Sequence, residues 1–167
     1  MVKSNTLDVS TVQSLAGQVK GPVILPDDAA YDEARKVWNG MIDRYPALIV
    51  RPLDVSDVIA AVNFAREHDL LLSVRGGGHN VAGHATNDGG IVIDLAEMKQ
   101  IEVDPAGRTV RVGGGATWGD VDAATQPHGL ATPGGVYSRT GIAGLTLGGG
   151  YGWLRSTYGL SCDNLIA

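Results

Sequence analysis

A histidine set among glycines is the feature of this sequence best suited to chemistry. His79 follows Gly76, Gly77 and Gly78, and these residues come directly after an apolar run, residues 70–74. Glycines at the end of a strand let the main chain approach a ligand closely and direct its N–H groups at an anion. The stretch therefore indicates an anion-binding loop that carries an imidazole, although a plain turn at the three glycines would give the same local pattern.

The standard nucleotide-binding motifs do not describe this loop. A dinucleotide-binding G-x-G-x-x-G that starts at Gly76 needs glycine at position 81, where the chain has Val81. A P-loop that starts at Gly78 needs lysine directly after Gly83, where the chain has His84. If the loop binds a phosphate, it must do so in another way.

Composition and charge narrow the classes of partner. The 167 residues suit one domain, and a net charge of −5 without any basic run disfavours nucleic-acid binding. Backbone amides would hold most of a bound phosphate, with Arg75 as the nearest cation, but Arg75 could equally pair with a local carboxylate. The single cysteine, Cys162, excludes an intrachain disulfide, and no signal peptide or membrane-spanning run is evident. These features predict a cytoplasmic protein without a membrane partner.

The elements that would position the loop are a strand, a helix and a second strand. Residues 47–51 form the first predicted strand, Asp54 caps a helix that runs to about His68, and residues 70–74 form the second strand. This order predicts a β-α-β unit with a parallel pair of strands. Helical spacing predicts that one face of the helix is buried, made of Val55, Val58, Ile59, Val62 and Ala65.

Further along the chain, the pattern changes to a hairpin and a second glycine-rich region. Residues 90–94 form a third predicted strand, and residues 101–112 form a hairpin around a Pro/Gly turn. Thr117 caps the next predicted helix, and glycines recur over residues 140–152. Small residues there would let the chain lie against a planar or anionic ligand.

Together these elements predict an α/β (α+β) fold with two subdomains. Residues 1–44 would form an N-terminal segment with a short helix, and residues 45–167 a ligand-binding domain. Within that domain, a small β-α-β subdomain would span about 45–104 and a second, mixed α/β subdomain about 105–167. The sequence stops inside an apolar run without a cap, so we expect a fragment whose second subdomain is incomplete.

Several ordered stretches carry a resemblance to a known family. Residues 75–83 resemble the R-x-G-G-H-x-x-x-G flavin loop of the berberine-bridge-enzyme-like oxidases, which have a vanillyl-alcohol-oxidase-type (PCMH-type) FAD-binding domain. Residues 51–58 resemble that family's R-P-x-x-x-x-D-V junction, and residues 112–118 its G-x-G-x-x-W segment. Residues 141–154 resemble its second flavin loop. The resemblance covers about residues 45–167.

The resemblance implies a PCMH-type FAD-binding fold in which two subdomains hold FAD between them. His79 would be bonded to the 8α-methyl carbon of the isoalloxazine, and the N–H groups of residues 76–80 would bind the pyrophosphate. A neutral imidazole nitrogen is a competent nucleophile for such a bond. No metal is expected. The other candidate cofactor contacts are Arg75, Gly76, Gly77, Gly78, Asn80, Gly83, His84, Tyr137, Thr140, Gly141, Gly144, Gly149, Gly150 and Gly152.

Two departures from the family's pattern bear on the chemistry. Some members have a second flavin bond from a cysteine, and the comparable position here, near Val136 and Tyr137, has none. Cys162 lies beyond the second glycine loop, so we predict a buried thiol there and a single FAD attachment through His79. The family's substrate domain, and most groups that would deprotonate a substrate, lie beyond Ala167, so no catalytic base is named.

These inferences favour the FAD-binding part of an oxidase. Its covalently held FAD would take a hydride from a small organic substrate, and molecular oxygen would reoxidise the flavin to give hydrogen peroxide. An FAD-dependent dehydrogenase of the same superfamily is the closest alternative. A non-catalytic or truncated flavin-binding module, and a nucleotide- or sugar-phosphate-binding protein without flavin, are two further alternatives. We expect the fragment alone to be inactive.

Overall fold

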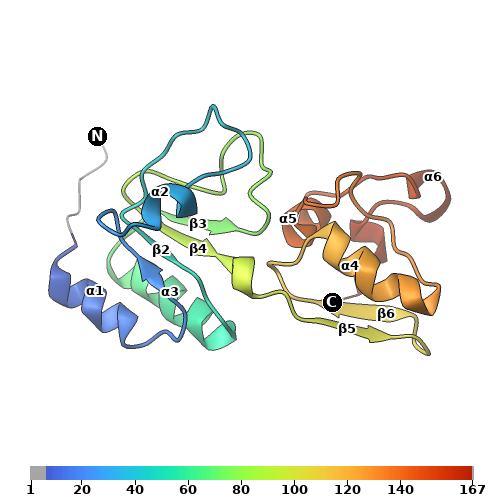
Figure 1. The fold of residues 1–167 in the computed structure, drawn as a ribbon, viewed down its shortest axis with the longest axis horizontal. Helices are drawn as coiled ribbons and strands as arrows, with labels where there is room; N and C mark the ends of the chain where they lie inside the picture. The colour runs from blue at the N-terminus through green and yellow to red at the C-terminus, as the bar shows by residue number, and fades with distance from the viewer. Residues whose placement is uncertain (1–6, 167) are drawn as a thin grey trace. The chain divides into compact units, whose positions relative to one another are not determined.

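The computed structural model describes residues 7–166, which divide into two compact units (Figure 1). Unit 1 ends at Glu97 and unit 2 begins at Met98. The first six residues of the expected N-terminal segment, and Ala167, lie outside the described residues. The first hairpin strand, β5 (Ile101–Asp104), lies in unit 2 because its pairing partner is the strand that follows it.

Unit 1 contains a four-stranded sheet in the order β1-β2-β4-β3. β2 (Leu48–Val50) and β3 (Leu72–Arg75) both pair in parallel with β4 (Ile91–Asp94), and β1 (Val23–Ile24) pairs antiparallel with β2. The predicted strands and their parallel direction are confirmed. The direct pairing of β2 with β3 is wrong, since β4 lies between them. β4 is buried at all its positions and suits the interior of the sheet, whereas β3 alternates between buried and exposed residues and suits an edge.

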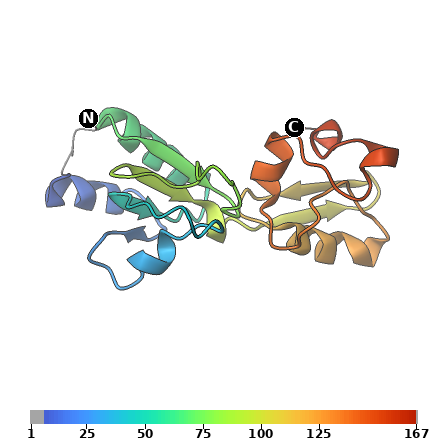
Figure 2. The same cartoon turned by 90° about the horizontal axis from the view of Figure 1, so that it is seen from above.

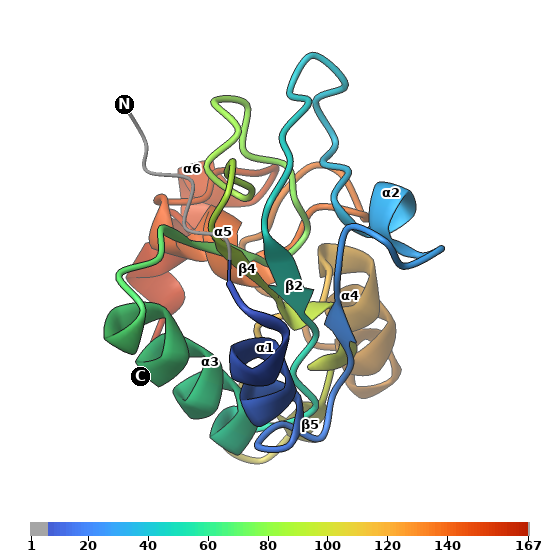
Figure 3. The same ribbon diagram turned by 90° about the vertical axis from the view of Figure 1, so that its left-hand side faces the viewer.

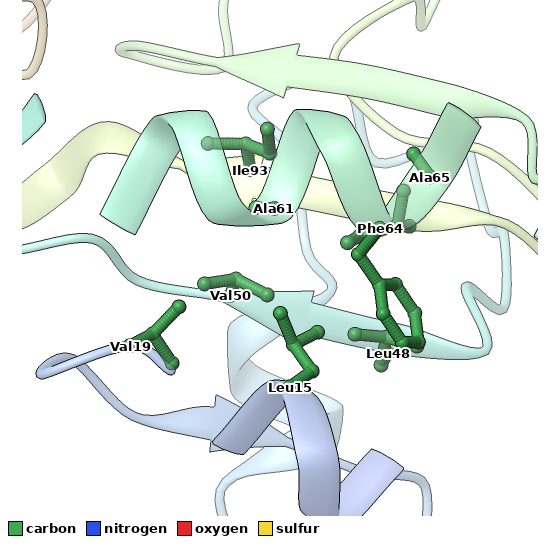
Figure 4. Packing of buried hydrophobic residues seen from close by; sticks show 9 residues of the cluster. Leu15, Val19, Leu48, Val50, Ala61, Phe64, Ala65 and Ile93 are labelled. Carbon is green, nitrogen blue, oxygen red and sulfur yellow. The ribbon is translucent and has the colours of Figure 1, made fainter. Parts of the chain in front are cut away.

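Helices cover both faces of this sheet. α1 (Val9–Ala16) and α3 (Val55–Glu67) lie on one face and α2 (Tyr31–Ala34) on the other (Figure 3). Successive side chains of a strand point to opposite faces. On the face of α1 and α3, the packed core consists of Leu15, Val19, Leu48, Val50, Ala61, Phe64, Ala65, Ile91 and Ile93 (Figure 4). On the other face it consists of Ile24, Tyr31, Ala34, Ile49 and Val92.

The helix α3 has the predicted extent and its predicted N-cap, but a different buried face. Its buried side chains are those of Asp57, Ala61, Phe64 and Ala65, which lie on one stripe at helical spacing. The large Phe64 ring and the hydrogen-bonded Asp57 fix the rotation of the helix. The predicted face is therefore wrong at Val55, Ile59 and Val62, whose exposed fractions are 64%, 56% and 40%, while Ala65 is buried as predicted.

The buried carboxylate of Asp57 joins the start of α3 to the chain before β1. It accepts hydrogen bonds from the backbone N–H groups of Lys20, Gly21 and Leu53, at 2.9, 3.0 and 3.0 Å. Burial acts to raise the pKa of Asp57, but these backbone hydrogen bonds outweigh it and hold the pKa below its ordinary value. An acidic residue three positions after an N-cap is typical of a local capping role, whereas two of the three partners of Asp57 are distant in the chain.

We expect Asp57→Asn to lower the free energy of unfolding by about 1–3 kcal/mol at neutral pH, because an amide NH₂ group would face backbone donors. The lowered pKa means that the carboxylate stabilises the fold above the ordinary pKa of 3.8 and loses this effect as pH falls through its folded value. Urea unfolding at pH 7 and at about pH 3 measures both effects. Asp27→Asn, at an exposed position, is the matched control. An equal cost for Asp57→Asn at both pH values would contradict this account.

Unit 2 is built on an antiparallel hairpin of β5 and β6 (Thr109–Val112), as predicted. α4 (Trp118–Thr125) packs against β5 (Figure 2). Thr117 caps α4 in a reciprocal capping box with Asp120. The shorter elements of unit 2 are α5 (Ile142–Leu147), α6 (Arg155–Tyr158) and the 3-10 turns Gln126–His128 and Cys162–Asn164, and unit 1 ends in the 3-10 turn Leu95–Glu97. Within residues 7–166, no helix has the length and apolar character needed to cross a membrane.

Candidate functional site

The glycine-rich loop begins where β3 ends and reaches β4 without any helix or strand. Gly77 and Asn80 are exposed, and Gly78 has a φ of +68°. The backbone N–H groups of Gly76, Gly77, Gly78 and Asn80 donate no hydrogen bond to any other residue within 7–166. Unused N–H groups in succession at the carboxyl end of a parallel strand are candidate donors to an anion.

The imidazole of His79 stacks on the indole of Trp38. The ring centroids are 5.4 Å apart and the ring planes differ by 21°. The backbone N–H of Trp38 also donates to the carbonyl oxygen of Gly78 at 3.1 Å, so the two segments meet through both main chain and side chain. Nothing in the sequence pointed to Trp38, which lies far from the glycine motif along the chain.

Arg75 faces into unit 1. Its guanidinium is buried and donates to Asp94 Oδ2 at 2.8 Å, to the carbonyl oxygen of Lys36 at 3.0 Å and to that of Ala34. Of the two roles considered for Arg75, the structure shows the pairing with a carboxylate. With Arg75 engaged in this way, the prediction that backbone N–H groups would hold most of a bound phosphate remains a prediction.

Asp94 receives a second cation from Arg51, whose Nε donates to Oδ2 at 2.8 Å. Burial acts to raise the pKa of Asp94, but the hydrogen bonds and charges of Arg75 and Arg51 outweigh it and hold that pKa below its ordinary value. The carboxylate at the end of β4 thus stays ionised and ties β3, β4 and the end of β2 together.

A segment from the start of the chain, residues 34–46, lies beside the glycine loop (Figures 1 and 3). Asn39 Nδ2 donates to the carbonyl oxygen of Val81 at 3.0 Å. Ile42 packs against Gly83, where a Cβ atom would come within 2.8 Å of Ile42 Cγ2 and where φ is +78°. Glycine at position 83 is therefore explained by this packing. The 34–46 segment sets the position of the loop.

Two more polar residues shape the far part of the loop. The backbone N–H of His84, an exposed residue, donates to Asn80 Oδ1 at 3.1 Å. The buried Asn87 donates from Nδ2 to Ser73 Oγ, and its Oδ1 accepts from the Gly90 N–H at 2.9 Å. Sequence reasoning passed over Asn87, although an Asn-Asp-Gly-Gly run is typical of a turn that a side-chain amide stabilises.

The remaining candidate cofactor contacts, at positions 137–152, lie in unit 2, and some of them are accessible to a ligand. Tyr137 is 75% exposed, and a Cβ atom at Gly144 would meet nothing within 4 Å. Gly141 is the N-cap of α5, and the carbonyl oxygen of Thr140 accepts from the Trp118 N–H at 3.0 Å. These residues are brought together around the start of α5.

Other glycines of unit 2 are required by its internal packing. A Cβ atom at Gly152 would lie 1.7 Å from the carbonyl oxygen of Gly134, and one at Gly150 would lie 2.5 Å from Ser161 Oγ. Gly149 has a φ of +104°, a conformation that favours glycine. The glycine content at these positions is thus accounted for without a ligand.

The expected burial of Cys162 is wrong. Its side chain is exposed, in the surface 3-10 turn Cys162–Asn164 that follows α6. Trp153 is 80% exposed, whereas Trp118 is buried. In the part of the chain that the structure describes, no cluster of three or more His, Cys, Asp or Glu residues is arranged to hold a metal ion.

Comparison with known proteins identifies what the fold and the loop resemble. Residues 46–167 match the family model described as an FAD binding domain. The chain is 44% identical over 148 residues to (R)-6-hydroxynicotine oxidase of Paenarthrobacter nicotinovorans, covering 89% of this chain and 32% of that protein. It is 41% identical over 156 residues to an FAD-linked oxidoreductase of Dictyostelium discoideum, covering 93% of this chain and 34% of that protein.

Solved structures with a similar fold belong to the same kinds of protein as the sequence relatives. The crystal structure of 6-hydroxy-D-nicotine oxidase from Arthrobacter nicotinovorans superposes with a TM-score of 0.85 at 44% identity, over 87% of this chain and 32% of that one. The berberine-bridge-enzyme-like protein 1 of Physcomitrella patens superposes with a TM-score of 0.86 at 31% identity, over 92% and 34%. The grass pollen allergen Phl p 4, described as having glucose dehydrogenase activity, gives 0.86 at 29% identity, over 93% and 35%. The chain thus spans about one third of each relative.

Proposed function

We propose that this chain holds FAD by one covalent bond from His79. The chain belongs to the FAD-binding domain family of the berberine-bridge-enzyme-like FAD-linked oxidoreductases. The observation that carries the proposal is the loop after β3, where the N–H groups of Gly76, Gly77, Gly78 and Asn80 make no hydrogen bond within residues 7–166. Those donors fit the pyrophosphate of FAD, and His79 stands among them.

The residues present fit the cofactor in charge and in space. A pyrophosphate is held by N–H donors and repelled by an unpaired carboxylate, and the carboxylate at the end of β4, Asp94, is paired with both Arg75 and Arg51. His79 is partly exposed, so a ligand can reach its ring.

Bound FAD supplies the redox chemistry, by accepting a hydride from a substrate carbon beside a hydroxyl or amine group. His79 would hold the cofactor through an imidazole nitrogen, which would give up its proton as the bond to the 8α-methyl carbon forms. Forming that bond would require a two-electron oxidant, for which molecular oxygen is the candidate. The chain's own part is to hold the pyrophosphate, to present the imidazole and to keep the loop in place.

We propose the whole protein to be an oxidase that acts on a small organic molecule. The relatives include a nicotine-derivative oxidase and a protein described as having glucose dehydrogenase activity, so a dehydrogenase is the second candidate. The chain spans about one third of these relatives, and the group that deprotonates the substrate is expected outside it. Oxygen consumption by the whole protein, compared with reduction of an artificial acceptor, separates the two candidates.

The covalent bond is tested on the chain itself. The chain is supplied with FAD, precipitated with acid and separated by denaturing electrophoresis. We expect its band to show flavin fluorescence. Flavin that appears only in the acid supernatant would leave FAD binding in place and contradict the covalent bond. Absence of flavin from both fractions would contradict the binding of FAD by this chain.

A further inference from the structure

We propose that Trp38 is a positioning residue that orients the His79 imidazole for its bond to the flavin. The inference rests on the function proposed above and concerns a residue outside the glycine motif. It arises from the stacked rings, whose centroids are 5.4 Å apart and whose planes differ by 21°.

The contact is built from the main chain outward. The Trp38 N–H donates to the Gly78 carbonyl oxygen at 3.1 Å, one residue before the histidine. On either side, the Lys36 carbonyl oxygen accepts from the buried Arg75, and Asn39 Nδ2 donates to the Val81 carbonyl oxygen at 3.0 Å. The backbone beneath the indole is therefore fixed before the two rings meet.

Core packing does not account for a tryptophan at this position. The Trp38 side chain is 62% exposed, whereas the indole of Trp118 is almost fully buried. An indole that stays largely in water gains little from burial, because that gain follows the apolar area removed from water. The contact that Trp38 does make is with the ring of His79.

Stacking suits a nucleophilic imidazole for a geometric reason. It engages the face of the ring, while both ring nitrogens lie in the ring edge. A histidine side chain has several staggered rotamers. Holding the ring plane in one orientation raises the fraction of time in which a nitrogen faces the reacting carbon, and misplacement of about 1 Å can slow a reaction about a hundredfold.

The test compares rates of flavin attachment among variants prepared without flavin and then supplied with FAD. We expect Trp38→Leu to slow the growth of covalent flavin fluorescence by about ten- to a hundredfold. Trp38→Phe keeps an aromatic face and should remain close to the wild-type rate. Tyr158→Leu, which removes an aromatic ring that is 60% exposed from α6 in unit 2, is the matched control and should leave the rate unchanged.

A second measurement separates positioning from binding or folding. In chains that carry His79→Ala, FAD binds without forming the bond, and Trp38→Leu should leave its dissociation constant and the unfolding midpoint unchanged. An equal weakening of FAD binding, or a rate for Trp38→Phe as low as for Trp38→Leu, would overturn the positioning role. A wild-type rate of attachment in Trp38→Leu would also overturn the positioning role, but covalent flavin in the wild type would still support the proposed bond from His79. Absence of covalent flavin from the wild type would contradict both the bond and the positioning role.

Discussion

Alanine in place of His79 is expected to remove all covalent flavin from the denatured chain, while the folded variant still binds FAD. The imidazole is the proposed nucleophile, and alanine offers no atom that can replace it. The N–H groups of Gly76, Gly77 and Gly78 belong to the main chain and are unchanged by the substitution. Flavin fluorescence of the acid-precipitated chain and flavin absorbance of the supernatant measure the two effects.

The control for this substitution is His128→Ala, which removes an exposed imidazole from a 3-10 turn in unit 2. It should keep the full covalent signal. A covalent signal that survives His79→Ala would assign the bond to another side chain, and the exposed Cys162 would be the first to replace. Loss of FAD from both the pellet and the supernatant would show that His79 is needed for binding and not only for the bond.

Arg75→Met is expected to lower the free energy of unfolding by about 3 kcal/mol at neutral pH. The substitution leaves the buried carboxylate of Asp94 with Arg51 alone, and breaking one side of a buried ion pair costs about 3–5 kcal/mol. It also removes the donor from the carbonyl oxygens of Ala34 and Lys36. Because those carbonyls precede Trp38, the variant should also slow flavin attachment. Urea unfolding and the rate of attachment measure the two effects.

The pH dependence of this cost has a definite sign. Asp94 has a lowered pKa in the folded protein, so the ion pair stabilises the fold above the ordinary value of 3.8 and loses its effect as pH falls through the folded value. The cost of Arg75→Met should therefore shrink in acid. Arg66→Met, at an exposed position in the last turn of α3, should cost less than about 1 kcal/mol. Equal costs for the two variants at pH 7 would contradict the structural role of Arg75.

Local pattern was enough for most of the secondary structure. Asp54 and Thr117 were predicted as helix N-caps and both are. These signals act over three or four residues, so the sequence carries them without help from the rest of the fold. Most of the buried face of α3 was predicted wrongly, since Val and Ile residues on one side competed with the stripe that contains Phe64 and Asp57. Which stripe is buried depends on what the sheet and the chain before β1 present to it.

Part of the candidate site was also predicted from local sequence. The glycines and histidine of residues 76–79 predicted an anion-binding loop at the end of a strand, and the structure has a loop with unused N–H donors at the end of β3. The sequence left open whether Arg75 meets a phosphate or a carboxylate. The choice depends on Asp94, which the parallel pairing of β3 with β4 places opposite Arg75.

By itself, the sequence determined the elements, the glycine loop and the histidine within it, because each depends on residues adjacent along the chain. Only the tertiary structure decided that β4 separates β2 from β3, that Arg75 points inward and that Trp38 covers the ring of His79. Each of these results joins segments far apart in the sequence. Periodicity and capping carry no information on such pairings. The pairings follow from the packing that buries β4 and pairs the carboxylate of Asp94 at its end with two arginines.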